Sequence, residues 1–305
     1  MKPDHQDIRI GTMAGKGAHT ADYIKSLIPL GFESFQINFW ESLEGVELPR
    51  LADELRPVLH ESGCVISSFA VFGNPLESDE GARETVRTWE QCIEHASLFG
   101  TDIVAGFAGR LRGRPIPDSL PRFRDVFGKL SDEAGQRDVR IAFENCSMGG
   151  NWQAGDWNIA HCPEAWELMF DALPADHVGL EWEPCHQLLL LIDPLAQLRA
   201  WHQKIFHVHG KDASVHWDTI RREGIASATP YAFHRNPGVG DTNWTDVISE
   251  LRRLGFEGSI DIEGWHDPVY RGEYEMTGQL HALRYLKECR GGSFVPNPPF
   301  CLGGK

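Results

Sequence analysis

The stretch IFHVHGKD, residues 205–212, has the pattern of a short buried β-strand that ends in polar residues. Side chains alternate along a strand, so Phe206 and Val208 face one way while His207 and His209 face the other. Lys211 and Asp212 follow at the point where we expect the strand to end in a loop. Two imidazoles on one face are either a hydrogen-bonded pair in the core or part of a functional site, and this stretch alone fits both interpretations.

Strand-like and helix-like patterns alternate along the whole chain. The expected strands cover residues 8–13, 35–40, 65–72, 102–109, 140–146, 178–186, 205–212 and 259–265. The clearest helix pattern follows the third strand, where Val86, Trp89, Ile93 and Ala96 form one apolar stripe. Other helices are expected from about residue 20 and over 48–63, 119–135, 163–173, 194–204, 245–254 and 274–289, the helix over 48–63 being interrupted or offset by Pro57. Eight strand–helix units in a chain of this length predict an α/β fold, a single parallel (β/α)₈ TIM barrel.

A doubly wound open sheet is the alternative fold, and it requires a glycine-rich phosphate-binding turn after the first strand. The only candidate for this turn is GTMAGKG, residues 11–17. Its spacing is one residue short for a P-loop, and no Ser or Thr follows Lys16. We therefore expect one barrel over residues 1–290 and an irregular C-terminal tail, rich in Gly and Pro, over residues 291–305.

Composition narrows the choice of partners and compartment. The formal charge is −15, from 29 Lys and Arg against 44 Asp and Glu, which argues against nucleic acid or an anionic membrane as a partner. The seven cysteines include no CxxC pair, as expected in a reducing compartment. No stretch approaches the roughly 20 apolar residues that span a bilayer, and no signal peptide pattern opens the chain. The expected location is cytoplasmic.

Four consecutive predicted strands end in residues that can ligate a metal ion. Glu144 ends the fifth strand and Glu183 the sixth, while His209 lies on the seventh and Glu263 on the eighth. In TIM barrels the C-terminal ends of the strands form the active site. Three carboxylates and one neutral imidazole suit a hard or borderline divalent cation, Mn²⁺ or Mg²⁺ more readily than Zn²⁺.

Five short motifs occur in order along these elements: FEN (143–145), EPCH (183–186), HVHGKD (207–212), PGVGDTNW (237–244) and DIEGW (261–265). This ordered set resembles the xylose isomerase-like TIM barrel superfamily, the sugar isomerase/epimerase family that includes ketose 3-epimerases. The likeness covers about residues 8–290. It implies that Glu144, Glu183, His209 and Glu263 ligate one divalent metal ion, with Mn²⁺ favoured and Mg²⁺, Co²⁺ or Zn²⁺ as alternatives.

The resemblance also implies roles in chemistry and binding. Glu144 and Glu263 would double as an acid/base pair on opposite faces of the substrate. His186 would lie beside the metal and bind substrate oxygens, and Arg235 matches a position that often contacts substrate. Lys211 is a further candidate for substrate contact, with a loop ion pair to Asp212 as its alternative role.

Two further points concern a possible sugar contact and the identity of the second metal ligand. Trp40, at the end of the second strand, offers a face on which a sugar could stack, although packing in the barrel is the simpler role. The second ligand of the family is usually Asp, and Glu183 is longer by one methylene. Glu181, two residues earlier on the same face, is therefore an alternative second ligand.

The expected function is a divalent-metal-dependent sugar isomerase or epimerase, which removes a proton next to a carbonyl through a metal-stabilised enediolate. The alternative is a metal-dependent lyase that cleaves a 3-keto C- or O-glycoside by β-elimination, suggested by Trp- and His-rich segments at 151–161 and 265–270. The expected partners are a small-molecule carbohydrate and a second copy of the chain, or a small second subunit for the lyase. The negative charge opposes the related DNA-repair endonucleases, and the four retained ligands oppose a non-catalytic scaffold.

Overall fold

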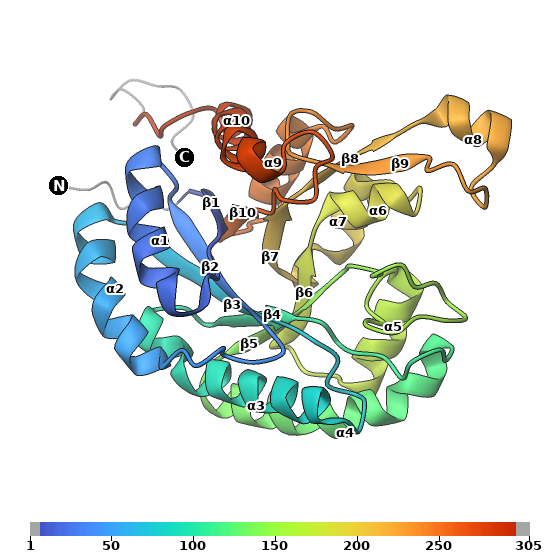
Figure 1. Ribbon diagram of the computed structural model, residues 1–305, viewed down its shortest axis with the longest axis horizontal. Helices are drawn as coiled ribbons and strands as arrows, with labels where there is room; N and C mark the ends of the chain where they lie inside the picture. The colour runs from blue at the N-terminus through green and yellow to red at the C-terminus, as the bar shows by residue number, and fades with distance from the viewer. Residues whose placement is uncertain (1–6, 297–305) are drawn as a thin grey trace, which may run out of the picture.

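Eight parallel strands close into a barrel in the computed structural model, which describes residues 7–296 (Figure 1). Around the ring the strands follow the order β1-β10-β7-β6-β5-β4-β3-β2. Their bounds are β1 Arg9–Met13, β2 Ser34–Trp40, β3 Val65–Phe72, β4 Ile103–Gly106, β5 Arg140–Glu144, β6 Val178–Trp182, β7 Ile205–Gly210 and β10 Ser259–Ile262. The closed ring confirms the predicted TIM barrel and excludes the open sheet.

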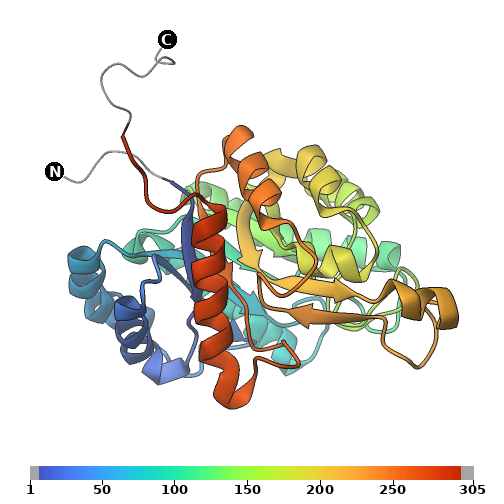
Figure 2. The same ribbon diagram turned by 90° about the horizontal axis from the view of Figure 1, so that it is seen from above.

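Helices surround the barrel and follow its strands along the chain (Figures 1 and 2). Their bounds are α1 Thr20–Leu27, α2 Leu48–Ser62, α3 Glu80–His95, α4 Ile116–Gln136, α5 Pro163–Ala172, α6 Pro184–Leu189, α7 Pro194–Trp201, α8 Trp217–Glu223, α9 Trp244–Arg253 and α10 Glu275–Cys289. The predicted interruption at Pro57 is wrong, because α2 runs through this residue. Pro57 lies on the exposed face of α2, where water can hydrate the carbonyl that the proline ring leaves without a donor.

Five strands, β4, β5, β6, β7 and β10, end earlier than predicted, and the ends of β6 and β7 lie beside site residues. β6 ends at Trp182 because Pro184 starts α6; proline has no N–H for a sheet and suits the first position of a helix. β7 ends at Gly210, and Asp212 begins another strand instead of a loop. Glu183 and His186 therefore lie just beyond β6, and Lys211 and Asp212 lie just beyond β7.

The long segment between β7 and α9 forms a hairpin that the sequence did not reveal. β8, Asp212–Val215, pairs antiparallel with β9, Ala232–Arg235, and α8 lies at the tip of this arm. Both views show the arm projecting away from the barrel, and α6 packs against it (Figures 1 and 2). Its strands have only four residues each and are mostly half-buried, so they lack the apolar alternation that predicts a strand.

Hydrogen bonds of Asp212 link the base of the arm to the start of α9. Its Oδ1 accepts hydrogen bonds from the backbone N–H groups of Ala213 (2.7 Å) and Thr242 (3.0 Å) and from the Thr242 hydroxyl (2.6 Å). Its Oδ2 accepts one from the indole N–H of Trp244 at 3.1 Å. Among the described residues Asp212 thus has a structural role rather than an ion pair with Lys211.

Replacing Asp212 is expected to destabilise the fold. Asp212→Ala leaves several buried donors without an acceptor, and at about 1–3 kcal/mol for each such group we expect a loss of about 3 kcal/mol or more. Asp212→Asn keeps the Oδ1 acceptor and should lose less. The free energies of unfolding in urea would test this, and equal values for the two variants would contradict the assigned role.

The main core lies between the barrel and its helices, and Trp89 of α3 is one of its largest fully buried side chains. The Trp89 ring is fully buried and lies 5.4 Å from the Phe127 ring and 6.5 Å from the Phe143 ring, centroid to centroid. Its indole N–H has no hydrogen-bond partner in residues 7–296. The ring therefore stabilises the fold through packing alone.

Two substitutions at Trp89 would separate packing from polarity. Trp89→Ala is expected to lower the free energy of unfolding by about 3–5 kcal/mol, because a large cavity replaces the ring. Trp89→Phe keeps the aromatic contacts and removes the unpartnered N–H, so its loss should stay below about 2 kcal/mol. Denaturant titration of both variants measures the difference, and a Phe variant as unstable as the Ala variant would contradict it.

The remaining sequence predictions concern the C-terminal tail, the cysteines and membrane-spanning helices. Residues 291–296 contain no helix or strand, whereas residues 297–305 of the predicted tail lie outside the described residues. The six cysteines in the described part are free thiols. None of the helices in this part is long and apolar enough to cross a membrane.

Candidate metal centre

The barrel brings the four predicted metal ligands together at the C-terminal ends of its strands. Glu144 is the last residue of β5, Glu183 follows β6, His209 lies in β7 and Glu263 follows β10. All four are buried, and each offers one ligand atom within 4.8 Å of the others. The four side chains predicted from the sequence therefore lie together, and their role as metal ligands stays a prediction.

The spacing of these atoms suits a small cation. His209 Nδ1 lies 3.3 Å from Glu144 Oε1 and 3.5 Å from Glu263 Oε2. In an octahedral site with bonds of about 2.1 Å, neighbouring ligand atoms lie roughly 3 Å apart. These residues therefore need only small adjustments to surround one divalent ion.

Several of the ligand atoms have no other partner. Glu183 Oε2, Glu263 Oε2 and His209 Nδ1 are buried and make no hydrogen bond within the described part of the chain. A buried carboxylate without a partner is costly, so such groups are normally paired or coordinate a metal ion. The donor set therefore fits a divalent cation, which these residues would hold.

Asn145, which directly follows Glu144, fixes the backbone of the next candidate ligand, Glu183. Its side-chain oxygen accepts the backbone N–H of Glu183 at 2.8 Å, and its amide donates to the Glu183 carbonyl at 2.9 Å. Asn158 similarly donates to the carbonyls of Glu144 and Cys146, both at 2.8 Å. The FEN motif thus contains one candidate ligand, Glu144, and the residue that fixes the backbone of the next candidate, Glu183.

The three carboxylates of the centre have different electrostatic surroundings. Burial, together with the charges of the other two carboxylates, raises the pKa of Glu144 to about 7 despite the opposing effect of His209. Burial likewise raises the pKa of Glu183 to about 7 against the charge of Lys211. Burial would also raise the pKa of Glu263, but Lys211 and His266 outweigh it and lower this pKa well below its usual range.

Lys211 and His266 hold one oxygen of Glu263. Lys211 Nζ donates to Glu263 Oε1 at 2.8 Å, and His266 Nε2 lies 3.0 Å from the same atom. Lys211 Nζ also lies 3.4 Å from His186 Nε2, which in turn approaches Glu183 Oε1 to 2.6 Å. These contacts leave Glu263 Oε2 free to face the centre.

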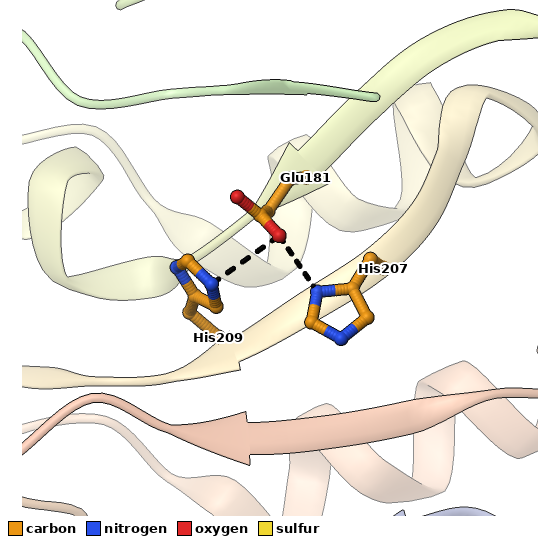
Figure 3. Close-up of side chains that lie close together, drawn as sticks. All are labelled: Glu181, His207 and His209. Atoms are coloured by element: carbon orange, nitrogen blue, oxygen red, sulfur yellow. Dashed lines mark hydrogen bonds and ion pairs between the residues drawn. The ribbon is translucent and has the colours of Figure 1, made fainter. Parts of the chain in front are cut away.

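Glu181 does not join the four-residue group. It lies one layer deeper in the barrel, where it forms a second group with His207 and His209 (Figure 3). Glu181 Oε1 lies 2.9 Å from His207 Nδ1 and 3.2 Å from His209 Nε2, the ring nitrogen that faces away from Glu144. The geometry therefore favours Glu183 over Glu181 as the second ligand, and His207 contacts Glu181 and Asp261 rather than the four-residue group.

A pocket of about 450 Å³ opens above the four-residue group. Its lining residues are Asn38, Trp40, Phe72, Phe107, Glu144, Cys146, Ser147, Met148, Gly149, His186, Leu189, Lys211, His234, Glu263, Trp265 and His266. Part of this lining is polar, with the rings of His186 and His234 5.3 Å apart and those of His234 and His266 5.5 Å apart. The other part is aromatic, with the Phe107 ring 5.1 Å from Phe72 and 6.3 Å from Trp40.

The predicted substrate-binding residues divide between this pocket and its surroundings. Trp40, His186 and Lys211 line the pocket, whereas Arg235 does not, and its guanidinium lies 3.0 Å from Asp267. His234 and His266 line the pocket and were not predicted. His234 is placed there by β9 of the arm, so no local pattern could have identified it.

Comparisons with known proteins agree with this fold. The family model described as "Xylose isomerase-like TIM barrel" matches residues 25–289. The rhizopine catabolism protein MocC of Rhizobium meliloti is 26% identical over 264 residues, which cover 80% of this chain and 73% of MocC.

Solved structures give the same fold. The 3-keto-D-glucoside 4-epimerase YcjR of E. coli is 16% identical with a TM-score of 0.69, over 93% of this chain and 100% of YcjR. An L-ribulose 3-epimerase is 15% identical with a TM-score of 0.66, over 93% of each chain. At these identities the structures support the fold alone, whereas the family model covers most of the sequence. The chain belongs to the xylose isomerase-like TIM barrel family.

Proposed function

We propose that this protein is a divalent-metal-dependent isomerase or epimerase that moves a proton on a carbon next to the carbonyl group of a sugar. The observation that carries this proposal is the buried group of three carboxylates and one imidazole beneath the pocket. Similarity to proteins named as epimerases of a ketose and of a keto-glucoside supports a sugar as the substrate. Mn²⁺ or Mg²⁺ suits a site rich in carboxylate oxygens.

The acid/base pair would be Glu144 and Glu263. A divalent ion at this centre would supply Lewis acidity, which stabilises negative charge on a substrate oxygen. Glu144, whose pKa is raised to about 7, is suited to remove a proton at neutral pH, and the C–H electron pair then moves into the double bond of an enediolate. Glu144 then passes this proton to solvent, and Glu263, after taking up a proton from solvent, returns it to the opposite face in an epimerisation or to the next carbon in an isomerisation. Lys211 and His186 would bind substrate oxygens.

Exchange of substrate protons with solvent tests this proposal directly. The purified protein with Mn²⁺ would be incubated in D₂O with a panel of ketoses and 3-keto glucosides, and exchange would be followed by NMR. We expect deuterium to enter at a carbon next to the carbonyl, with formation of an epimer or isomer. No exchange with any member of such a panel would contradict the proposal.

A second candidate is a lyase that cleaves a 3-keto glycoside by β-elimination. The aromatic part of the pocket favours it, because Phe72, Phe107 and Trp265 belong to an apolar cluster separate from the main core. Trp40 is partly exposed beside them, so the pocket presents aromatic faces on which an aromatic aglycone could pack. Release of a chromogenic aromatic alcohol from its 3-keto glucoside would support this candidate, and exchange without release would favour the epimerase.

A further inference from the structure

We propose that a buried chain of hydrogen-bonded side chains beneath the metal centre fixes the tautomer and the orientation of His209. This inner chain consists of Asp261, His207, Glu181 and Gln36. Its key member is Glu181, a positioning residue that acts through His209. The inference rests on the proposed metal site and assigns the residues that prepare it.

The contacts of His209 determine which of its ring nitrogens carries the proton. His209 Nε2 lies 2.9 Å from Gln36 Oε1 and 3.2 Å from Glu181 Oε1. Both neighbours accept hydrogen bonds, so Nε2 must carry a proton, and Nδ1 is left as the nitrogen that can offer its lone pair to a metal ion in place of a second proton. Nδ1 is the atom that faces Glu144 and Glu263 and has no hydrogen-bond partner in the described residues.

The orientation of the Gln36 amide is itself fixed. Gln36 Nε2 donates to Glu181 Oε1 and to the Ser68 hydroxyl, the latter at 2.9 Å. A carboxylate accepts only from the nitrogen side of an amide, so the oxygen of Gln36 must face His209. Glu181 therefore acts on His209 both directly and through Gln36.

The lower end of the inner chain anchors Glu181. His207 donates from Nδ1 to Glu181 Oε1 at 2.9 Å and from Nε2 to Asp261 Oδ2 at 2.8 Å, as two flanking acceptors require. Asp261 also accepts the hydroxyls of Ser34 and Ser67. Figure 3 shows Glu181 from β6 between the two histidines of β7, with its contacts to both rings dashed.

This arrangement is unusual for the inside of a barrel, where branched apolar side chains normally fill the layers. All four members are at most 1% exposed, and buried polar groups are costly unless they are hydrogen-bonded. Buried ionic groups are often no more stabilising than well-packed apolar ones. Stability alone therefore does not account for this layer, whereas control of His209 does: a carboxylate on the far nitrogen of a metal-binding histidine fixes its tautomer and raises its basicity.

The test compares Glu181→Gln with the unaltered protein through metal binding rather than activity. Loss of such a supporting carboxylate typically weakens metal binding about 10- to 100-fold, and we expect that range for Mn²⁺. We also expect the visible absorption spectrum of bound Co²⁺ to change, because the geometry around the ion depends on His209. Glu33→Gln is the matched control, since Glu33 pairs with Arg290 outside the metal centre, and it should change neither readout.

Two further variants distinguish a loss of folding from a loss of support for His209. If Glu181→Gln does not fold, Gln36→Met removes the other acceptor of His209 Nε2 at similar side-chain length and should also weaken Mn²⁺ binding. Glu181→Asp keeps the charge and should bind Mn²⁺ more tightly than Glu181→Gln. Unchanged affinity and an unchanged Co²⁺ spectrum in the Glu181 and Gln36 variants would overturn this inference while leaving the proposed function intact. An unaltered protein that binds no metal would instead overturn the proposed function.

Discussion

Glu144→Gln is expected to reduce the exchange of substrate protons with solvent by about 10³-fold, the range lost with a general base. Glutamine keeps the size of the side chain and one oxygen for a metal ion, but it cannot accept the proton. The raised pKa of Glu144, about 7, makes this carboxylate the better base of the pair at neutral pH. The measurement is deuterium incorporation by NMR at saturating Mn²⁺, with bound Mn²⁺ determined in the same sample.

Glu164→Gln provides the matched control for this experiment. Glu164 is exposed in the first turn of α5, so the same chemical change there should leave exchange unaltered. A Glu144→Gln protein that binds Mn²⁺ and exchanges protons at the normal rate would show that Glu144 is not the base. Exchange lost together with the metal would assign Glu144 a role as ligand without testing its role as base.

Divalent metal ions are expected to stabilise the folded protein. Glu144, Glu183 and Glu263 place three buried carboxylates within reach of one ion, and a ligand that binds only the folded state stabilises it by about 2.7 kcal/mol at 100 times its Kd. With an unfolding entropy of about 2.1 cal/mol/K per residue, this raises Tm by about 4 °C for a chain of this length. Thermal unfolding with and without Mn²⁺, after chelator treatment, measures the shift.

Glu183→Met separates this effect from general stabilisation by salt. The variant removes a ligand whose Oε2 has no hydrogen-bond partner in the described residues and replaces it with an apolar chain of similar length. We expect its Tm without metal to equal or exceed that of the unaltered protein, because a buried carboxylate is lost. Its response to Mn²⁺ should disappear, and a persistent shift of about 4 °C would place the ion elsewhere.

The barrel and the gathering of four candidate ligands could be predicted from the sequence because both depend on local patterns. Apolar strands ended in Glu144, His209 and Glu263, and the parallel order of a barrel places such ends on one rim. The choice between Glu183 and Glu181 could not be predicted, because it depends on Pro184 ending β6 and turning the chain into α6. Both glutamates are buried, and only their depth in the barrel separates their roles.

Other parts of the site depend on contacts between residues distant in sequence. The arm brings His234 to the pocket, and its short, half-buried strands gave no pattern of their own. Asp261 and Gln36 were not predicted as site residues. In the structure Asp261 of β10 hydrogen-bonds to His207 and Gln36 of β2 to His209, both in β7. Such networks appear only when the barrel closes.

The most direct test of the metal centre is elemental analysis of the purified protein after dialysis with Mn²⁺, beside His209→Ala and His60→Ala. His60 is an exposed residue of α2 and serves as the control for loss of an imidazole. The four-residue centre predicts about one metal ion per chain in the unaltered protein and in His60→Ala, and little or none in His209→Ala. No bound metal in the unaltered protein, or the same amount in His209→Ala, would contradict the metal centre and the function proposed from it.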